Sequence, residues 1–460
     1  MTRGLPLGMQ LQLALWRNRR KRPKPELRAA AIGLTTELRL EQALRGTRVS
    51  HTWDLARERD FRAHLPDPSP TSVSVIMPVR DRERVVSAAV ESVLAQSWPT
   101  WELIVVDDGS TDLTPDVLAR FTAKDVRIRV ITTGSAGVSA ARNTGIRAAT
   151  GDFVAFLDSD NTWSVDFLAT AIRGLQLHDS SFGYAGTQEH RADGVRYRGY
   201  RGGLANLPLG NFIDLNAVLV RRELLDRVGG FDVTLRRMVD YDLVWRLSEL
   251  CDPAFLPFIG VIYQAGTELT DRISVVEPLA WDAVVKVRRS RDWASVRVAP
   301  RHADLVSVVI PVTPGSNGAV DTVAALRAMA ELWTVEVIVV DSGLAPAAAF
   351  DLHLGLASSA AKVVRVPTNL GAAGAFDVGL ADTVGHSVLL LPPGARPGPG
   401  LVAALTDMGQ HTLAGREVLA APAAALLRGT GLDPLLSLEA AVHAFATSVG
   451  ARPLPAGALA

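Results

Sequence analysis

Cysteine and net charge are both nearly absent from this sequence. Its 460 residues include one cysteine, Cys251, and 48 basic residues against 48 acidic ones. A single cysteine excludes a disulfide within the chain and fits a reducing compartment. Zero net charge gives no reason to expect nucleic acid as a partner, and no apolar run approaches the roughly 18 to 20 residues that span a bilayer. We therefore expect a cytoplasmic protein without a membrane-spanning helix.

The N-terminal segment carries its charge in an unusual place. An apolar stretch, GLPLGMQLQLALW, precedes residues 17–24, of which six in eight are basic. A secretory signal has the reverse order. Two interpretations stay open. The segment is either a solvated, partly disordered tail or a peripheral contact with an anionic membrane surface at its inner face.

Length and patterning predict more than one domain. Residues 1–70 form an Arg-rich lead-in with helical patterning, and DPSPTS at 67–72 is a linker by its Pro and Ser content. Short β-branched runs then alternate with amphipathic helical segments; the runs are SVSVIMPV, WELIVVDD, VRIRVITT and DFVAFLD. Continuous apolar strands that alternate with helices predict an α/β fold, with a mostly parallel sheet covered on both faces.

The sequence also contains an internal repeat. Two pairs of segments match at one shared offset of 234 residues: WELIVVDDG with VEVIVVDSG, and RNTGIRAATGDFVAFLDSD with FDVGLADTVGHSVLLLPPG. SVSVIMPV matches LVSVVIPV at nearly the same offset. A register shared over this distance indicates duplication. We therefore expect two tandem α/β domains, at residues 72–290 and 304–460.

Acidic residues follow two strands of the first copy. Asp158 and Asp160 follow the run DFVAFL, and Asp107 and Asp108 end WELIVVDD. Ligands of parallel sheets bind beyond the carboxyl ends of the strands. Side chains at i and i+2 on extended backbone point the same way, and Mg²⁺ or Mn²⁺ is often held by one or two carboxylates plus phosphates. The acids thus predict a metal and nucleotide site. The alternative is an ordinary loop, because Asp-x-Asp tripeptides such as residues 158–160 and Asp-Gly-Ser turns such as the one after Asp107 are also common on loops.

Two later features have a structural and a functional interpretation each. Arg142 and Asn143 follow the Gly-containing segment SAGVSAA, so Arg142 is either an ordinary helix-surface arginine or lies near the nucleotide. Asp240 and Asp242 lead an apolar helical stretch. They are either N-terminal capping residues, a position that suits aspartate, or part of the site.

The motif series as a whole resembles family 2 glycosyltransferases, which have the GT-A fold. The resemblance covers about residues 72–265 and is carried by VSVIMPVRD, ELIVVDDGSTD, SAARNTGIRAATGDFVAFLDSD, NAVLVRRELLDRVGGFD and VDYDLVWRL, in the family's order. It implies that Asp158 contacts the ribose side of the nucleotide, Asp160 carries Mn²⁺ or Mg²⁺, and Asp240 is the catalytic base. It also implies nucleotide-sugar contacts from Pro78, Asp107, Asp108 and Arg142.

The implied function is metal-dependent, inverting transfer of a sugar from a UDP-, GDP- or dTDP-sugar. The acceptor would be a hydroxyl of a glycan or a lipid-linked molecule, as in polysaccharide biosynthesis. A cation neutralises the charge that grows on the leaving diphosphate, and a carboxylate within about 3 Å takes the proton of the acceptor hydroxyl. One base and one metal give a single displacement, with inversion at the sugar carbon.

The sequence departs from the family pattern at three places. Arg80 and Asp81 stand where the family usually has Tyr-Asn, Val239 replaces the usual Glu, and no His follows Tyr263 in YQAGTEL. These departures bear on metal geometry and acceptor placement. The resemblance implies that residues 180–216 face the acceptor. The Arg and Tyr content of this segment favours a polar or anionic acceptor.

The second copy keeps the strand pattern and loses the acids. At the shared register Asp108 becomes Ser342, Arg142 becomes Phe376, and Asp158, Ser159 and Asp160 become Pro392, Pro393 and Gly394. A hydrophobic pattern is enough to maintain a packed core, so this copy should fold even though its site residues are replaced. We expect a degenerate domain that serves assembly, acceptor binding or stability. Two alternatives stay open: an inactive scaffold or binding protein, and a nucleotidyltransferase, which PVRDRERVV disfavours because it lacks glycine.

Overall fold

The chain divides into two compact units. The computed structural model describes residues 50–459 except 51, 192–193, 265–280, 290, 330–333, 358, 407, 409–410, 428–431, 435 and 455–457. Of these, residues 50–264 form the first unit and residues 281–459 the second. The basic cluster at 17–24 lies outside the described residues, so its membrane contact stays a prediction. No helix in the described part of the chain is long and apolar enough to cross a membrane.

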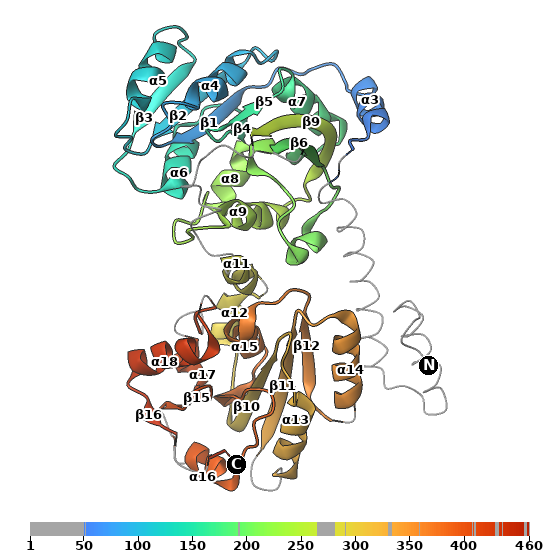
Figure 1. The fold of residues 1–460 in the computed structure, drawn as a ribbon, viewed down its shortest axis with the longest axis vertical. Helices are drawn as coiled ribbons and strands as arrows, with labels where there is room; N and C mark the ends of the chain where they lie inside the picture. Colours follow the sequence, from blue (N-terminus) through green and yellow to red (C-terminus); the bar gives the residue numbers. More distant parts are fainter. Residues whose placement is uncertain are drawn as a thin grey trace. The chain divides into compact units, whose positions relative to one another are not determined.

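A nine-stranded sheet organises the first unit, with the order β3-β2-β1-β4-β8-β6-β9-β5 and β7 beside β6 (Figure 1). Its strands are β1 (Val73–Val79), β2 (Trp101–Asp107), β3 (Ile128–Thr132), β4 (Phe153–Phe156), β5 (Asn161–Trp163), β6 (Phe182–Arg191), β7 (Gly194–Arg198), β8 (Val218–Arg221) and β9 (Ala254–Gln264). The strands β1 to β4 are mutually parallel. Their carboxyl ends therefore meet at one edge, where ligands of such sheets bind.

Helices cover both faces of this sheet, as the continuous apolar strands predict. They are α3 (Leu55–Ala63), α4 (Val86–Leu94), α5 (Thr114–Thr122), α6 (Val138–Ala148), α7 (Phe167–Leu177), α8 (Arg222–Val228) and α9 (Val239–Ser248), with 3₁₀ turns η2 (Leu204–Leu209) and η3 (Leu215–Ala217). One core joins α4, α5 and α7 to the side chains of Val75 and Met77. Helix α6 packs on the other face, where Gly145 lies so close to Ile76 that a Cβ would be 2.4 Å from it.

Part of the lead-in belongs to the first unit. Phe61 of α3 is buried in the core of the sheet. Trp53 lies against two glycines of the β6–β7 hairpin region, where a Cβ on Gly186 or Gly199 would fall within 2.4 Å of the indole ring. Residues 52–63 therefore pack against the sheet of the first unit.

The second unit contains a seven-stranded sheet of order β12-β11-β10-β13-β15-β14-β16. Its strands are β10 (His302–Val312), β11 (Val335–Ser342), β12 (Lys362–Val366), β13 (Gly385–Leu390), β14 (Leu413–Ala414), β15 (Leu419–Pro422) and β16 (Arg452–Pro453). β10 to β13 are parallel, and β15 runs antiparallel to β13, as β8 does to β4. The expectation of two tandem α/β units with mostly parallel sheets is confirmed.

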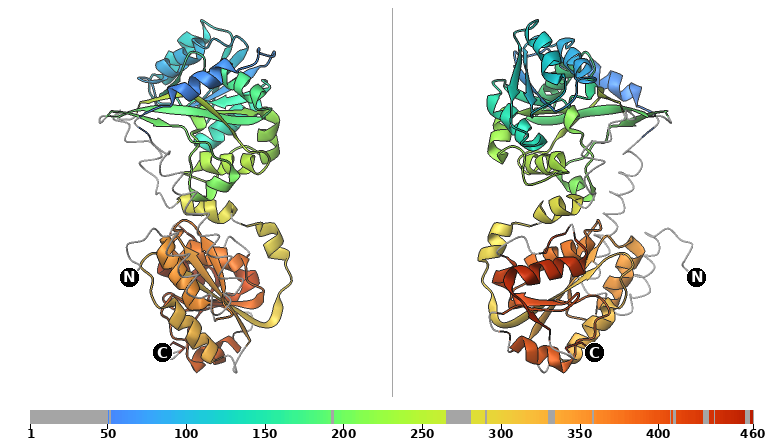
Figure 2. Two further views of the ribbon diagram at one scale, coloured as in Figure 1. Left: turned by 90° about the vertical axis from the view of Figure 1, so that its right-hand side faces the viewer. Right: turned by 60° about the vertical axis from the view of Figure 1, so that its left-hand side comes forward.

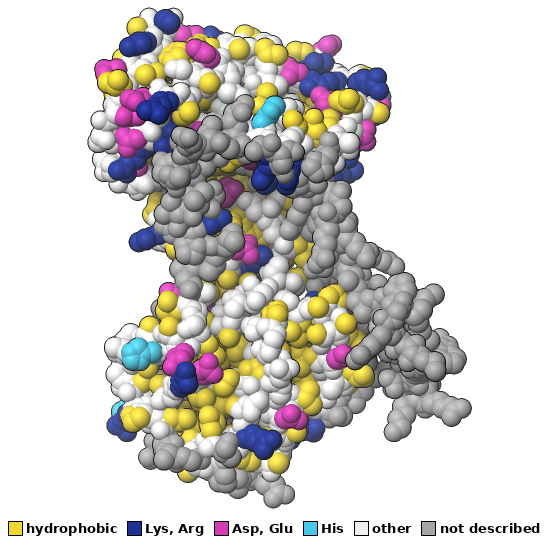
Figure 3. Space-filling model, in the orientation of Figure 1, with side chains coloured by type: hydrophobic (Ala, Val, Ile, Leu, Met, Phe, Trp, Pro, Cys, Tyr) yellow, Lys and Arg dark blue, Asp and Glu magenta, His cyan; other side chains and the backbone are white. Residues whose placement is uncertain are grey.

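Helices also cover both faces of the second sheet (Figures 1 and 2). They are α11 (Trp281–Arg289), α12 (Trp293–Val298), α13 (Ala319–Ala328), α14 (Pro346–Leu356), α15 (Gly371–Ala381), α16 (Pro399–Thr406), α17 (Ala423–Leu426) and α18 (Leu438–Val449). One core holds α13, α14 and α16, and the other holds α11, α12, α15, α17 and α18. In Figure 3 hydrophobic side chains dominate the visible face of this unit, whereas charges of both signs are interspersed on the first.

The two sheets share strand register and a buried polar cluster at their amino ends. In the first unit Glu102 accepts from Ser74 Oγ at 2.6 Å, and Ser74 Oγ accepts from Gly151 N at 2.8 Å. In the second, Ser307 donates to Glu336, and Gly385 N donates to Ser307 Oγ at 2.8 Å. The cluster fixes the turn before β4 and before β13 in the same way. It ties three strands together through buried groups that would be costly to leave unpaired.

The first prediction concerns this cluster. Burial alone would raise the pKa of Glu102, but hydrogen bonds from Ser74 and Thr150 outweigh it and lower the pKa from 4.5 to about 2. Because the folded value is depressed, the stabilisation is complete above pH 4.5 and is lost as pH falls toward 2. We expect Glu102→Gln to lower the unfolding free energy by about 1.5–3 kcal/mol at neutral pH. In thermal melts the difference between the two proteins should stay constant from pH 7 to about 4.5 and shrink as the pH falls to 3; a difference that stays constant down to pH 3 would contradict the account.

Candidate active site

A cavity of about 930 Å³ lies at the carboxyl ends of β1 and β4 in the first unit. Its wall includes most of the residues that the sequence predicts for the site: Pro78, Asp108, Arg142, Asp158, Asp160 and Asp240. Asp107 is not part of the wall; it is buried, and its Oδ1 accepts from the backbone N–H of Ser110 at 2.9 Å. The fold therefore brings together side chains from five separate segments of the chain.

Arg142 on α6 is buried and forms an ion pair with Asp158. Its Nη2 lies 2.6 Å from Asp158 Oδ1, and only 7% of the arginine side chain is exposed. Its guanidinium carbon lies 5.4 Å from the centre of the Phe231 ring. A charge buried this deeply needs a partner close by. The pair explains why Arg142 is not the helix-surface arginine that its sequence context alone allowed.

Asn216 holds the same aspartate from the other side. Asn216 Oδ1 accepts from the backbone N–H of Asp158 at 2.6 Å, and Asn216 Nδ2 lies 3.3 Å from Asp158 Oδ2. Asn216 Nδ2 also donates to Asp214 Oδ1 at 2.9 Å. Burial raises the pKa of Asp214; hydrogen bonds from Asn216 oppose the shift, and the nearby charge of Asp158 adds to it. The position of Asp158 is thus fixed before any ligand arrives.

Asp160 is the acid that the sequence predicts to share a cation with a ligand. It lines the cavity two residues beyond Asp158, whose carboxylate is already engaged by Arg142 and Asn216. Among the described residues no group of three or more His, Cys, Asp or Glu is arranged to hold a metal ion. Mg²⁺ and ions like it are often held by one or two carboxylates with substrate phosphates completing the shell. The donor set fits an ion shared with a diphosphate rather than an ion held by protein alone.

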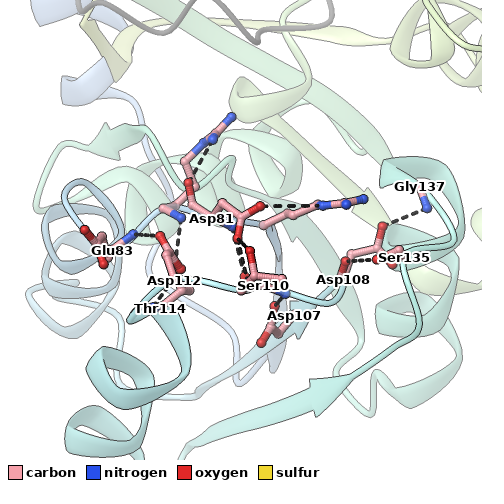
Figure 4. A network of polar contacts seen from close by, with 12 residues as sticks. Asp81, Glu83, Asp107, Asp108, Ser110, Asp112, Thr114, Ser135 and Gly137 are labelled. Atoms are coloured by element: carbon pink, nitrogen blue, oxygen red, sulfur yellow. Dashed lines mark hydrogen bonds and ion pairs between the residues drawn. The ribbon is translucent and has the colours of Figure 1, made fainter.

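Asp108 anchors the loop that leads into α6 (Figure 4). Its Oδ1 accepts from Thr133 Oγ1 and from the backbone N–H of Ala136, both at 2.8 Å, and its Oδ2 accepts from Gly137 N at 2.7 Å. Gly137 has a φ of 93°, which favours glycine. The geometry assigns Asp108 a loop-holding contact, and a direct nucleotide contact stays a prediction.

The segment after β1 is tied to the segment after β2, where the sequence departs from the family. Asp81 N donates to Ser110 Oγ at 2.9 Å, and Asp81 Oδ1 accepts from Thr111 N at 2.7 Å (Figure 4). Glu83 N donates to Asp112 Oδ2 at 3.1 Å. Asp81 adopts a φ of 50°, an uncommon value for a residue other than glycine. These reciprocal bonds give the cavity a rigid rim on the side of β1 and β2.

Asp240 lies in the first turn of α9, half-buried in the cavity wall. Its Oδ2 accepts from Asn211 Nδ2 at 2.9 Å. Burial raises the pKa of Asp240, whereas the backbone N–H of Tyr241, the charge of Arg142 and the bond from Asn211 lower it, with a net upward shift. A carboxylate with a raised pKa at a cavity wall is a suitable proton acceptor.

Asp242, two residues further along α9, has a different environment. Its side chain is fully buried and pairs with Arg246, whose Nη2 lies 2.7 Å from Asp242 Oδ2. Arg246 Nη1 donates to the carbonyl of Val228 at 2.6 Å and so ties α9 to the end of α8. The two acids that look alike in the sequence therefore separate into one at the cavity and one in the core.

The β6–β7 hairpin contributes a buried acid with two arginines. Glu189 Oε2 lies 2.8 Å from Arg191 Nη2, and Glu189 Oε1 lies 2.5 Å from Arg198 Nε. All three residues line the cavity, and only 5% of the Glu189 side chain is exposed. The shared carboxylate holds two guanidinium groups at the cavity wall, in the segment where we expect the acceptor.

The equivalent edge of the second unit is closed. Asp341, the counterpart of Asp107, is buried against Arg365, with Nη1 2.6 Å from Oδ2. Phe376 is fully buried in the position of Arg142. The segment that replaces the acids packs on the start of α13, where a Cβ on Gly318 would lie 2.7 Å from the Cα of Gly394. The backbone at Gly318 therefore packs against the backbone at Gly394, at the position where the first unit has its cavity.

Four functional candidates were absent from the sequence-based prediction: Asn211, Asp214, Asn216 and Glu189. The sequence held one weak signal for them. NFIDLN is a polar interruption just before the apolar strand β8, in the segment that we expected to face the acceptor. Asn211 and Asn216 bind Asp240 and Asp158, which lie 29 and 58 residues away in sequence, so no local pattern could have assigned the two asparagines.

Comparison with known sequences gives a consistent result. Residues 74–240 match the model of glycosyl transferase family 2. The chain is 42% identical over 113 residues to the UDP-Glc:alpha-D-GlcNAc-diphosphoundecaprenol beta-1,3-glucosyltransferase WfgD of Escherichia coli, covering 24% of this chain and 44% of that protein. It is 38% identical over 103 residues to the glycosyltransferase GlyA of Streptococcus pneumoniae serotype 4, covering 22% and 15%. The chain spans about half the length, or less, of these curated relatives.

Solved structures provide a more distant match. The TarS 1–349 fragment of S. aureus, crystallised with UDP-GlcNAc, aligns over 50% of this chain and 68% of that one, with 20% identity and a TM-score of 0.42. The mannosyltransferase PcManGT of Pyrobaculum calidifontis, in complex with GDP-Man and Mn²⁺, aligns over 60% and 77%, with 19% identity and a TM-score of 0.36.

The second prediction separates the two acids of α9. Removing the charge of Asp242 leaves the buried guanidinium of Arg246 without its counter-charge, so Asp242→Asn should destabilise the first unit by about 3 kcal/mol. Asp240→Asn should change stability little, because Asp240 lies at the cavity wall and keeps a hydrogen-bonding side chain. Urea unfolding of both variants beside wild type checks this. Equal losses of stability would show that Asp240 is a structural residue.

Proposed function

We propose, from the premise that residues 74–240 form a glycosyl transferase family 2 domain, that this chain is a metal-dependent, inverting glycosyltransferase. Its donor would be a UDP-, GDP- or dTDP-sugar. The observation that carries the proposal is the joint position of Asp160 and Asp240 on one cavity wall, with Asp158 held between Arg142 and Asn216. A cation-binding acid and a proton-accepting acid are what this transfer requires.

The donor side of the proposal uses three residues. Asp160 would hold Mn²⁺ or Mg²⁺ together with the diphosphate, and Asp158 would take the ribose side of the nucleotide while Arg142 fixes its carboxylate. A bound divalent cation would neutralise the charge that grows on the leaving diphosphate. The protein then needs no strong acid for the leaving group, and none of its own residues has to donate a proton there.

The acceptor side depends on Asp240. In its ionised form it would take the proton of the acceptor hydroxyl as that oxygen attacks the sugar carbon. A single base on one side and a leaving group on the other give one displacement with inversion. Because burial raises the pKa of Asp240, activity should fall on the acid side at a higher pH than for an ordinary aspartate.

The acceptor proposed is a glycan or a lipid-linked molecule. The printed name of WfgD describes a diphosphoundecaprenol-linked acceptor, which supports this class for the present chain without naming its member. Arg191 and Arg198 at the cavity wall are suited to an anionic group. The basic cluster at 17–24 supports peripheral contact with the inner face of a membrane.

For the second unit we propose a degenerate copy of the catalytic fold. The shared strand order and the repeated Ser-Glu cluster support a common origin. The closed edge at Gly318 and Gly394 supports the loss of its ligand site. Its role would be assembly, acceptor binding or stability. A protein in which both copies are inactive is the alternative, and the intact acids of the first unit argue against it.

The third prediction tests the activity itself. Nucleotide release is measured from a panel of UDP-, GDP- and dTDP-sugars with Mn²⁺ or Mg²⁺, for wild type, Asp160→Ala and Asp240→Asn. We expect metal-dependent turnover of one donor, reduced about 10²–10⁴-fold when the base is lost. Asp116→Asn, an exposed acid on α5 outside the cavity, is the matched control and should keep full activity.

The outcomes distinguish the alternatives. Metal-dependent nucleotide binding without turnover, lost only in Asp160→Ala, would indicate that the acceptor is required. Neither binding nor turnover by wild type would favour the scaffold. Turnover that survives both substitutions would refute the assigned roles of these two acids.

A further inference from the structure

One short loop contacts both sides of the candidate active site. Residues 211–216, with the sequence NFIDLN, follow η2 and include the first two residues of η3. At one end Asn211 Nδ2 donates to Asp240 Oδ2 at 2.9 Å. At the other end Asn216 Oδ1 accepts from Asp158 N at 2.6 Å, and Asn216 Nδ2 lies 3.3 Å from Asp158 Oδ2. The proposed base and the donor-side acid are therefore both held by this loop.

Each asparagine has a fixed amide orientation. Asn211 Oδ1 accepts from Ile213 N at 3.2 Å, which turns Nδ2 toward Asp240. Asn216 Oδ1 faces the backbone N–H of Asp158, so its Nδ2 faces the two acids. Because the amide oxygen can only accept and the amide nitrogen can only donate, these partners exclude the flipped orientations. The loop thus presents two donors in set directions.

The loop is also anchored to the elements around it. The hydroxyl of Tyr241, next to Asp240 on α9, donates to the carbonyl of Leu207 in η2, the turn just before the loop. Trp163 Nε1 donates to the carbonyl of Asn216 at 2.8 Å. Phe212 packs edge-on against Tyr200, with ring centres 5.5 Å apart. The backbone therefore has little freedom to follow a substitution at either asparagine.

We propose that Asn211 and Asn216 are positioning residues that act on separate halves of the reaction. Asn211 holds the carboxylate of Asp240 for the acceptor hydroxyl, and Asn216 holds Asp158 for the donor and its cation. Neither asparagine needs to touch the reacting atoms. The inference rests on the proposed function, since it assigns roles within the same site. Reactive groups must be held within fractions of an ångström, and supporting hydrogen bonds provide that accuracy.

Loss of Asn211 has a defined consequence for pH dependence. The charged groups that line the cavity with Asp240 come from every element around it. They are Arg80, Asp81 and Arg82 after β1, Asp108 after β2, Arg142 from α6, Asp158 and Asp160 beyond β4, Glu189, Arg191 and Arg198 from the β6–β7 hairpin, Asp214 from the same loop, and Arg237 before α9. The bond from Asn211 stabilises the ionised carboxylate. Asn211→Ala should raise the pKa of Asp240 and move the acid limb of kcat/KM to higher pH. Asn211→Asp, which is nearly isosteric, places a like charge beside it and should move the limb further.

Loss of Asn216 should act on the donor side alone. Without its amide, Asp158 keeps Arg142 but loses two hydrogen bonds that set the backbone and carboxylate before Asp160. We expect Mn²⁺-dependent binding of a nucleoside diphosphate to weaken about 10-fold, as is typical when support for a metal site is removed. The acid limb should stay where it is in wild type.

The experiment measures both properties in every protein. Wild type, Asn211→Ala, Asn211→Asp, Asn216→Ala and Asn216→Ser are compared by kcat/KM against pH with the donor that wild type turns over. The same proteins are titrated with UDP, GDP and dTDP, with and without Mn²⁺, and their melting curves verify folding. The serine variant keeps a small polar group at the buried position 216, in case alanine impairs folding.

The expected result is a crossed pattern. In the Asn211 variants the acid limb of kcat/KM moves to higher pH, further for aspartate than for alanine, and the nucleotide affinity stays at the wild-type value. In the Asn216 variants the nucleotide affinity falls and the acid limb stays at the wild-type pH. Folded variants that change both properties together, or neither, would overturn the inference while leaving the proposed function intact. A wild type with neither turnover nor Mn²⁺-dependent nucleotide binding would overturn the proposed function, and this inference with it.

Discussion

The candidate active site depends on the pairing of one buried guanidinium with one carboxylate. Arg142 lies inside α6 with 7% of its side chain exposed, and Asp158 lies 2.6 Å from it at the end of β4. An unpaired charge at that depth would be strongly destabilising, so the pair fixes Asp158 relative to α6. Asp160 then follows two residues later at the cavity wall, and Asn216 extends the arrangement to the loop that holds Asp240.

The two units show which parts of the architecture are structural and which are specific to the site. At the amino ends of the strands both units keep the same buried cluster, formed by Ser74 with Glu102 and by Ser307 with Glu336. At the carboxyl ends they differ. The first unit has a cavity there, whereas in the second unit the backbone at Gly318 packs directly against the backbone at Gly394. A parallel sheet needs its turns fixed in either case, whereas the cavity lined by acids is a feature of the first unit.

The sequence predicted the part of the first unit that contains β1 to β4, where the hydrophobic pattern follows the structure. β1, β2 and β4 are buried on both faces, so their apolar runs stand out, and the acids that follow them were found at the expected edge. The strands β6 to β9 are mixed in burial and direction and left no such pattern. Asn211 was unpredictable for another reason: its role exists only because a loop and α9, 29 residues apart in sequence, meet in space. Asp240 and Asp242 look equivalent in sequence, and only packing distinguishes them.

The central claim is that one ligand site per chain has been retained and that it needs a cation shared with the nucleotide. Equilibrium titration of the whole chain with a nucleoside diphosphate, with and without Mn²⁺, tests it most directly, because the stoichiometry counts working sites independently of any acceptor. The account predicts one nucleotide bound per chain, only when Mn²⁺ or Mg²⁺ is present, and none in Asp160→Ala. Two nucleotides per chain, or binding of equal strength without the cation, would contradict it.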